Sequence, residues 1–127
     1  MDAVIPYQGE HLILIRRKNP PFQGQYALPG GFVDIGETVE QACIRETKEE
    51  TNLEVSIQKL VGVFSDPDRD PRGHTVTVAY LCEVHSDSPP PKALDDAAAL
   101  EIVPLKKVTT LQLAFDHKKI LQQAGII

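Results

Sequence analysis

The sequence predicts a single α/β (α+β) domain in which a mixed β-sheet is flanked by helices. Three observations lead to this fold class. Short apolar or alternating segments recur along the chain, a segment of helical periodicity interrupts them near residue 40, and a second one closes the chain. The length of 127 residues suffices for one hydrophobic core and is short for two, so residues 1–127 are expected to form one domain.

The composition narrows the classes of function. The formal net charge is −5, which argues against a basic surface that grips nucleic acid. An acidic protein that handles phosphates needs metal ions or a local group of Arg and Lys side chains. No apolar run approaches the roughly 18 residues of a membrane span, and the N-terminus lacks a signal-peptide pattern. We therefore expect a cytoplasmic protein without membrane contact.

The chain has two cysteines, Cys43 and Cys82. Their spacing indicates neither a metal site nor a disulfide framework. Since free cysteine is among the most often buried residue types, both are expected to be reduced core residues.

The N-terminal part predicts strands joined by sharp turns. Apolar residues 3–7 and 11–15, separated by a short turn, predict a β-hairpin with a short first strand. Prolines hold residues 19–24 as an extended loop. At Pro29, Gly30 and Gly31 the backbone is expected to turn sharply.

Three further strands are expected at residues 54–64, 74–84 and 100–103. The strand at 74–84 has few polar residues on either face, which is typical of a central strand. Residues 115–124 predict a closing helix that ends at Gly125.

The first helix is expected to run from Thr38, its N-cap, to Asn52, a plausible left-handed C-cap. No capping box is expected, because Glu is missing three residues after Thr38. An apolar stripe at i, i+3 and i+4 opens the helix with Val39, Ala42 and Cys43. Seven residues later the same three positions are held by carboxylates: Glu46, Glu49 and Glu50.

Three like charges on one helical face repel each other, and burying any of them unpaired is costly. A divalent cation is the simplest neutralising partner, and Mg²⁺ prefers oxygen ligands. The alternative is a solvated acidic face, which is the reading we prefer for Glu40 and Lys48 because they lie off the stripe.

The spacing of fixed residues from Gly31 to Leu53 resembles the Nudix box, the signature of the Nudix hydrolases. The matching positions are Gly31, Glu37, Arg45, Glu46, Glu49, Glu50 and Leu53. Two positions depart from the signature: Thr47 replaces an aliphatic residue, and Asn52 replaces a glycine. Neither departure removes a charge, and Asn tolerates the left-handed conformation, so we expect an active box.

The resemblance implies an α/β/α sandwich with a mixed β-sheet and a Mg²⁺-dependent pyrophosphatase, for which Mn²⁺ can substitute. It implies metal ligands at Glu46, Glu49 and Glu50, helped by a backbone carbonyl near Gly30. In Nudix proteins the counterparts of Glu37 and Arg45 pair to fix the loop against the helix. Either Glu49 or Glu50 is a candidate general base, and a base on a loop is the alternative. The implied catalytic residues are therefore Glu37, Arg45, Glu49 and Glu50.

Outside the box, the chain is similar to the ADP-ribose pyrophosphatase group of Nudix enzymes. The similar stretches are Arg16-Arg17, residues 26–31, residues 65–76 and Asp95-Asp96-Ala97. This group hydrolyses ADP-ribose to AMP and ribose 5-phosphate. A proline some fifteen residues past the box often marks the group, and Pro67 and Pro71 bracket that position.

The candidate substrate-binding residues are Arg17, Tyr26, Asp68, Arg72 and His74. The arginines suit phosphate oxygens, and an aromatic face suits a nucleobase. Three of these residues have a structural alternative: core packing for Tyr26, an ion pair with a neighbouring arginine for Asp68, and a structural hydrogen bond for His74. Asp95 and Asp96 are either a cap or late carboxylates near the metal.

Two other functions stay open from the sequence. One is a nucleoside triphosphate pyrophosphohydrolase that acts on damaged nucleotides, and the other is a non-catalytic module that senses ADP-ribose. In each case the expected partner is a small nucleotide. Dimerisation is common in the group, so the resemblance also implies a homodimer as one of the alternatives for the oligomeric state.

Overall fold

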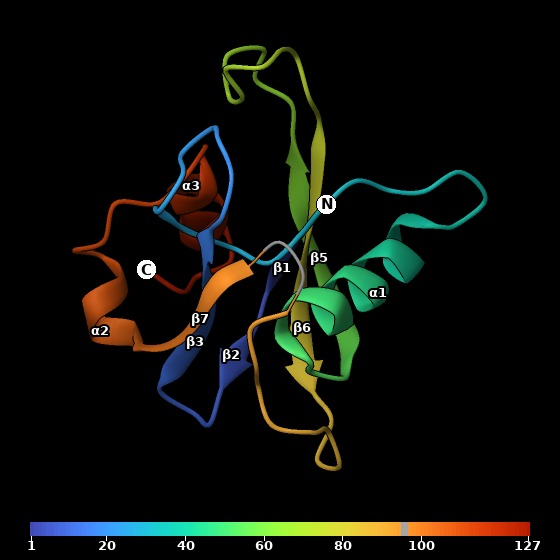
Figure 1. Ribbon diagram of the computed structural model, residues 1–127, viewed down its shortest axis with the longest axis vertical. Helices are drawn as coiled ribbons and strands as arrows, with labels where there is room; N and C mark the ends of the chain where they lie inside the picture. Colours follow the sequence, from blue (N-terminus) through green and yellow to red (C-terminus); the bar gives the residue numbers. More distant parts are fainter. Residues whose placement is uncertain (95–96) are drawn as a thin grey trace.

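The computed structural model describes residues 1–94 and 97–127, and Figure 1 shows the chain. The elements in chain order are β1 (Asp2–Val4), β2 (Pro6–Tyr7), β3 (His11–Arg17), β4 (Tyr26–Ala27), α1 (Val39–Thr51), β5 (Val55–Phe64), β6 (Thr77–Val84), β7 (Ala97–Pro104), α2 (Leu105–Val108) and α3 (His117–Gln123). Asp95 and Asp96, expected as a cap or as late carboxylates, lie outside the described residues.

The first sheet has three strands in the order β1-β6-β5. Strand β6 pairs in parallel with β1, where Ala3 lies opposite Tyr80, and antiparallel with β5, where Val63 lies opposite Val78. The predictions of a mixed sheet and of a central strand in this part of the chain are therefore confirmed.

The second sheet is built around β3, which pairs antiparallel with β2, β4 and β7. The predicted hairpin is correct only for β2 and β3. Residues 2–4 instead form β1 of the other sheet, and the chain changes sheet at Ile5, whose carbonyl still accepts a hydrogen bond from the Ile13 amide at 3.0 Å. One apolar run thus supplies two strands: the first is fully buried in the β1-β6-β5 sheet, and the second is only partly buried beside β3.

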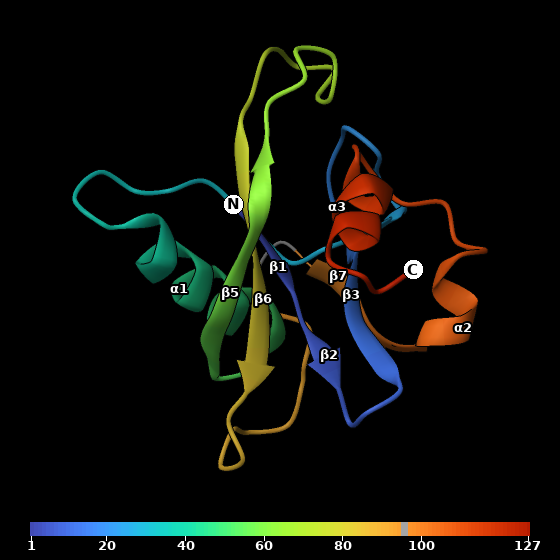
Figure 2. The same cartoon turned by 180° about the vertical axis from the view of Figure 1, so that it is seen from behind.

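Helices α1 and α3 lie on opposite sides of the β1-β6-β5 sheet, as both views show (Figures 1 and 2). Side chains of β6 alternate between the two cores that result. Tyr80 and Cys82 pack in the cluster that contains Cys43 of α1, whereas Ala79 packs in the cluster that contains Ile120 of α3. This arrangement confirms the α/β/α sandwich.

The ends of α1 explain its position. The Thr38 Oγ1 accepts a hydrogen bond from the Gln41 amide at 3.0 Å, and the Gln41 side chain accepts one from the Thr38 amide at 2.8 Å. The prediction of no capping box was therefore wrong, because Gln serves as well as Glu at this position. Asn52 ends the helix with a φ of 67°, the left-handed cap that was predicted.

Three other boundaries differ from the prediction. Strand β7 begins at Ala97 rather than at residue 100, because the pairing with β3 continues to Arg17. Strand β6 begins at Thr77 rather than at residue 74, because Thr75 donates its hydroxyl to Asp70 within a compact loop. Helix α3 begins at His117 because Phe115 has a φ of 51°, which is incompatible with a helix. Within the described residues, none of the helices has the length and apolar character needed to cross a bilayer.

Candidate active site

A pocket of about 410 Å³ opens where the turn before α1, the second half of α1 and the loop between β5 and β6 come together. Its acidic lining residues are Asp2, Asp34, Glu46, Glu50 and Asp70. Its basic lining residues are Arg17, Lys18, Arg69, Arg72 and His117. The pocket therefore offers both cation ligands and anion-binding groups within one space.

Glu50 is the most buried carboxylate of α1, with only 5% of the residue exposed. Its Oε1 accepts a hydrogen bond from the Gly30 amide at 3.2 Å. Burial raises the pKa of Glu50 to about 9, and the negative charge of Glu46 adds to this rise, against the hydrogen bond from Gly30. Burial also raises the pKa of Glu46, although Arg45 opposes the effect. The charged forms of both carboxylates are therefore disfavoured unless a further positive charge lies beside them.

Gly30 and Gly31 permit a close approach between the chain and these carboxylates. A Cβ atom on Gly31 would lie 2.5 Å from Cδ of Glu46, and one on Gly30 would lie 2.2 Å from the carbonyl oxygen of Met1. Any larger residue would displace Glu46 or the first strand. The glycines are thus required by space at this point.

Arg45 connects the loop to the helix. Its guanidinium donates to both carboxylate oxygens of Glu37, at 2.6 and 3.0 Å, and to the Phe32 carbonyl at 3.1 Å. It also donates to Glu46 at 2.9 Å and to Glu49 at 3.1 Å. Hydrogen bonds from Arg45 lower the pKa of Glu37. The pairing expected from the Nudix resemblance is present in the structure.

Glu49 differs from the other two carboxylates of the predicted metal set. Its side chain is 45% exposed, its Oε2 pairs with Arg45, and it is not among the residues that line the pocket. The structure thus brings Glu46 and Glu50 together beside Gly30 and leaves Glu49 at the rim.

The donor set fits a hard divalent cation. The side-chain ligands on offer are carboxylate oxygens, which Mg²⁺ and Mn²⁺ favour. A cation beside Glu50 and Glu46 would stabilise the charged forms of both carboxylates, which burial otherwise disfavours.

Two predicted substrate residues, Arg17 and Arg72, line the pocket. Arg17 donates to the Pro21 carbonyl at 2.6 Å, and its guanidinium lies 4.9 Å from the centre of the Phe115 ring. Arg72 pairs with Asp70 and lies 5.8 Å from the centre of the Phe32 ring. Both arginines are thus held in place at the pocket.

The other three predicted substrate residues, Tyr26, Asp68 and His74, do not line this pocket. The Tyr26 hydroxyl accepts a hydrogen bond from Arg16 at 2.6 Å, and its ring packs against the α3 core. His74 Nε2 lies 2.9 Å from the Ser65 carbonyl, as in the structural alternative. Asp68 is exposed on the loop, where its amide donates to Asp66.

The residues that line the pocket include a buried polar network that the sequence did not predict. The Leu28 amide donates to Nδ1 of His117 at 3.0 Å, which leaves Nε2 to face Oδ1 of Asp2 at 3.3 Å. Thr77 donates to the other oxygen of Asp2 at 2.6 Å. Burial alone would raise the pKa of Asp2, but His117 and Thr77 outweigh it and lower the value to about 2. No local pattern could reveal contacts between residues this far apart in sequence.

Arg69 belongs to the same network. Its guanidinium donates to both oxygens of Asp116, at 3.0 and 2.7 Å, and lies 3.9 Å from Asp2. Only 6% of its side chain is exposed. This residue therefore anchors the loop between β5 and β6 to the segment before α3.

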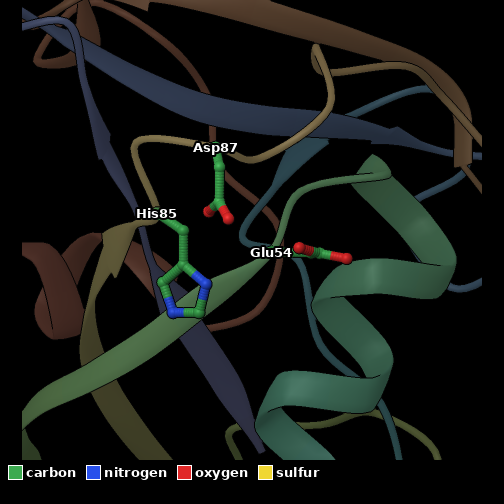
Figure 3. A group of neighbouring side chains, drawn as sticks. All are labelled: Glu54, His85 and Asp87. Atoms are coloured by element: carbon green, nitrogen blue, oxygen red, sulfur yellow. The ribbon is translucent and has the colours of Figure 1, made fainter.

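A separate group of metal-type side chains lies at the other end of β6. Glu54, His85 and Asp87 offer ligand atoms within 4.8 Å of one another. Figure 3 shows these three side chains as neighbours. All three are exposed, and Glu54 also lies 3.6 Å from Lys48. Since Thr77 at the start of β6 lines the pocket and His85 follows the end of that strand, the group is not part of the candidate active site.

Comparison with known proteins agrees with this geometry. The NUDIX domain family matches residues 2–124. The ADP-ribose pyrophosphatase of Methanocaldococcus jannaschii is 50% identical over 122 residues, which are 96% of this chain and 69% of that protein.

Two solved structures are also similar. One is the NUDIX domain of Shewanella oneidensis NrtR complexed with ADP ribose, with a TM-score of 0.83, 29% identity, and coverage of 98% of this chain and 83% of that chain. The other is a bifunctional NMN adenylyltransferase/ADP ribose pyrophosphatase from Francisella tularensis complexed with AMP and a Mn ion. Its TM-score is 0.80 at 30% identity, with coverage of 95% of this chain and 38% of that chain. With its box, its fold and its match over nearly the whole length, the chain belongs to the NUDIX family of hydrolases.

Proposed function

We propose that this protein hydrolyses ADP-ribose to AMP and ribose 5-phosphate in a reaction that depends on Mg²⁺, with Mn²⁺ as a substitute. The observation that carries the proposal is the pairing of Glu46 and Glu50 in a pocket that also holds Arg17 and Arg72. A diphosphate needs both kinds of group, because its oxygens must be bound by cations while the phosphorus is attacked by water.

The similar proteins support the choice of substrate. One relative is an ADP-ribose pyrophosphatase, and one similar NUDIX domain was solved with ADP ribose. The Francisella tularensis protein was solved with AMP, the proposed nucleotide product, and with a Mn ion.

Each part of the pocket has a proposed role. Glu46, Glu50 and the Gly30 backbone would hold the cation, and Glu49 would join from the rim when its hydrogen bond to Arg45 is broken. When bound, Mg²⁺ supplies charge neutralisation for the diphosphate oxygens. Arg17 and Arg72, which line the same pocket, bind and orient the phosphates. Arg45 keeps the loop that carries Gly31 and Phe32 against α1.

The decisive experiment is a substrate panel with identified products. The purified protein is incubated with Mg²⁺ and ADP-ribose, dinucleoside polyphosphates, nucleotide sugars or nucleoside triphosphates. We expect the highest kcat/KM for ADP-ribose, with AMP and ribose 5-phosphate in equal amounts. Glu50→Gln should be inactive on all substrates, while Glu10→Gln, in the exposed turn before β3, should keep full activity.

The other outcomes distinguish the alternatives. A triphosphate with the highest kcat/KM would identify a nucleoside triphosphate pyrophosphohydrolase. Tight binding of ADP-ribose without turnover at saturating Mg²⁺ would identify a sensing module. The homodimer expected from the resemblance stays a prediction, which light scattering of the purified protein can test.

A further inference from the structure

The only two cysteines of the chain lie in contact in the folded protein. Cys43 on α1 and Cys82 on β6 are 39 residues apart in sequence, yet their Sγ atoms are 3.6 Å apart. Cys43 is 0% and Cys82 1% exposed, and both belong to the core between α1 and the β1-β6-β5 sheet. The two sulfur atoms are 3.6 Å apart and the S–S bond length is about 2.05 Å, so only a small movement is needed to join them.

From this contact we infer that Cys43 and Cys82 are an intramolecular oxidation site, at which a peroxide joins α1 to β6 by a disulfide bond. The inference does not depend on the proposed hydrolysis. It concerns the contact between the first half of α1 and β6, and it requires neither substrate nor metal.

The two thiols are chemically unequal, which gives the reaction an order. The hydrogen bond with Cys82 lowers the pKa of the Cys43 thiol, whereas the same bond and burial raise the pKa of Cys82. Cys43 is therefore the nucleophile: its sulfur takes one oxygen from hydrogen peroxide and gives a sulfenic acid and water. The Cys82 thiol then attacks that sulfur, and a second water leaves as the S–S bond forms. The peroxide is reduced and the two thiols are oxidised.

A second groove lies beside the cysteine pair. Cys82 is among the residues that line this groove, of about 460 Å³, together with Tyr7, Leu53 and His85. This groove lies at the end of β6 that is opposite to the candidate active site. Since Cys43 is 0% and Cys82 1% exposed, oxidation requires a local opening of the structure beside this groove.

The disulfide would fix the helix that carries the box to the central strand. A bond between residues 43 and 82 closes a long loop, and restricting such a loop in the unfolded chain stabilises the fold. For a domain of this size we expect a rise in Tm of about 5–15 °C on oxidation.

The test treats the folded, reduced protein with hydrogen peroxide and follows it by intact mass, thiol titration after denaturation, and Tm. The expected result is a mass loss of two hydrogen atoms, no titratable thiol, the higher Tm, and full reversal by a dithiol reductant. Trypsin under non-reducing conditions should release residues 19–45 joined to residues 73–92, because no Lys or Arg lies inside either stretch before its last residue.

Cys43→Ser and Cys82→Ser are the matched controls, and neither should gain stability with peroxide. The peptide map of the wild-type protein is independent of whether these variants fold. The inference would be overturned if both thiols stayed titratable after treatment, if the protein gained oxygen atoms in place of losing hydrogens, or if the cross-link joined two chains.

Discussion

The guanidinium of Arg45 donates two hydrogen bonds to the carboxylate of Glu37, at 2.6 and 3.0 Å, and thereby ties the loop before α1 to the middle of that helix. The same guanidinium also contacts Glu46 and Glu49, so that one side chain sets the position of the loop and of two carboxylates.

The first prediction follows from this geometry. Arg45→Lys keeps the positive charge but loses the planar fork that contacts Glu37 and Phe32 together. We expect kcat/KM to fall about 10- to 100-fold, with a higher Mg²⁺ concentration needed for half-maximal rate. The control is Arg16→Lys, which alters an exposed pair with Glu101 away from the pocket and should change the rate by less than about twofold. Equal effects of the two substitutions would contradict the role given to Arg45.

The second prediction concerns the balance between metal binding and stability at Glu50. Glu50→Gln should abolish Mg²⁺-dependent turnover but leave the metal-free protein at least as stable as the wild type, because a carboxyl with a pKa of about 9 is already uncharged at neutral pH and the amide has nearly the same shape. Thermal unfolding with chelator and with Mg²⁺ measures both effects. The wild-type Tm should rise with Mg²⁺, and the Tm of the variant should not. Full activity of Glu50→Gln at saturating Mg²⁺ would rule out the metal-ligand assignment.

The third prediction is that the contribution of Asp70 to the free energy of unfolding depends on pH. Hydrogen bonds from Arg72 lower the pKa of Asp70 from 3.8 to about 2, with help from Thr75. A carboxyl with a lowered folded-state pKa stabilises the protein above its unfolded pKa, and this contribution is lost as pH falls through the folded pKa. Asp70→Asn should therefore cost roughly 1–2 kcal/mol at pH 7, and the difference should shrink between about pH 4 and pH 2.

Urea unfolding of the two proteins at several pH values measures this difference. Asp68→Asn, on the exposed part of the same loop, is the control and should unfold like the wild type at each pH. A constant gap between Asp70→Asn and wild type down to the acid limit would show that the carboxylate charge is not the cause.

The fourth prediction separates Arg72, which lines the pocket, from His74, which does not, as substrate contacts. Arg72→Gln should raise KM for ADP-ribose about tenfold or more with a smaller change in kcat, since a phosphate contact present in both ground and transition state is lost. His74→Gln should leave KM within about twofold, because His74 faces the Ser65 carbonyl and not the pocket. Steady-state kinetics of the two variants give the answer, and a larger effect at His74 would reverse the assignment.

The parts of the fold and site that the sequence predicts are those encoded locally. The spacing of Glu46 and Glu50 on one helix is fixed by 3.6 residues per turn, so their shared face follows from the sequence alone. The left-handed cap at Asn52 and the alternation of β6 are local in the same sense. The capping box could also have been predicted from the sequence, since Gln41 stands at the required position.

The parts that the sequence does not predict depend on distant segments that meet. Asp2 and His117 come from the two ends of the chain, and no pattern near either residue indicates the other. Tyr26 illustrates the opposite case, in which a residue next to the box turns to the α3 core instead of the pocket. Cys43 and Cys82 are each predicted as buried, but only the pairing of α1 with the sheet brings their sulfurs together.

The alternation along β6 has a consequence for how the sequence can change. Tyr80 and Cys82 serve the core under α1, while the neighbouring Ala79 serves the core under α3. If one residue were inserted into or deleted from this strand, every side chain after that point in the strand would move to the opposite core. A change of length within β6 is therefore incompatible with the fold, because the cores under α1 and α3 both depend on the alternation of this one strand.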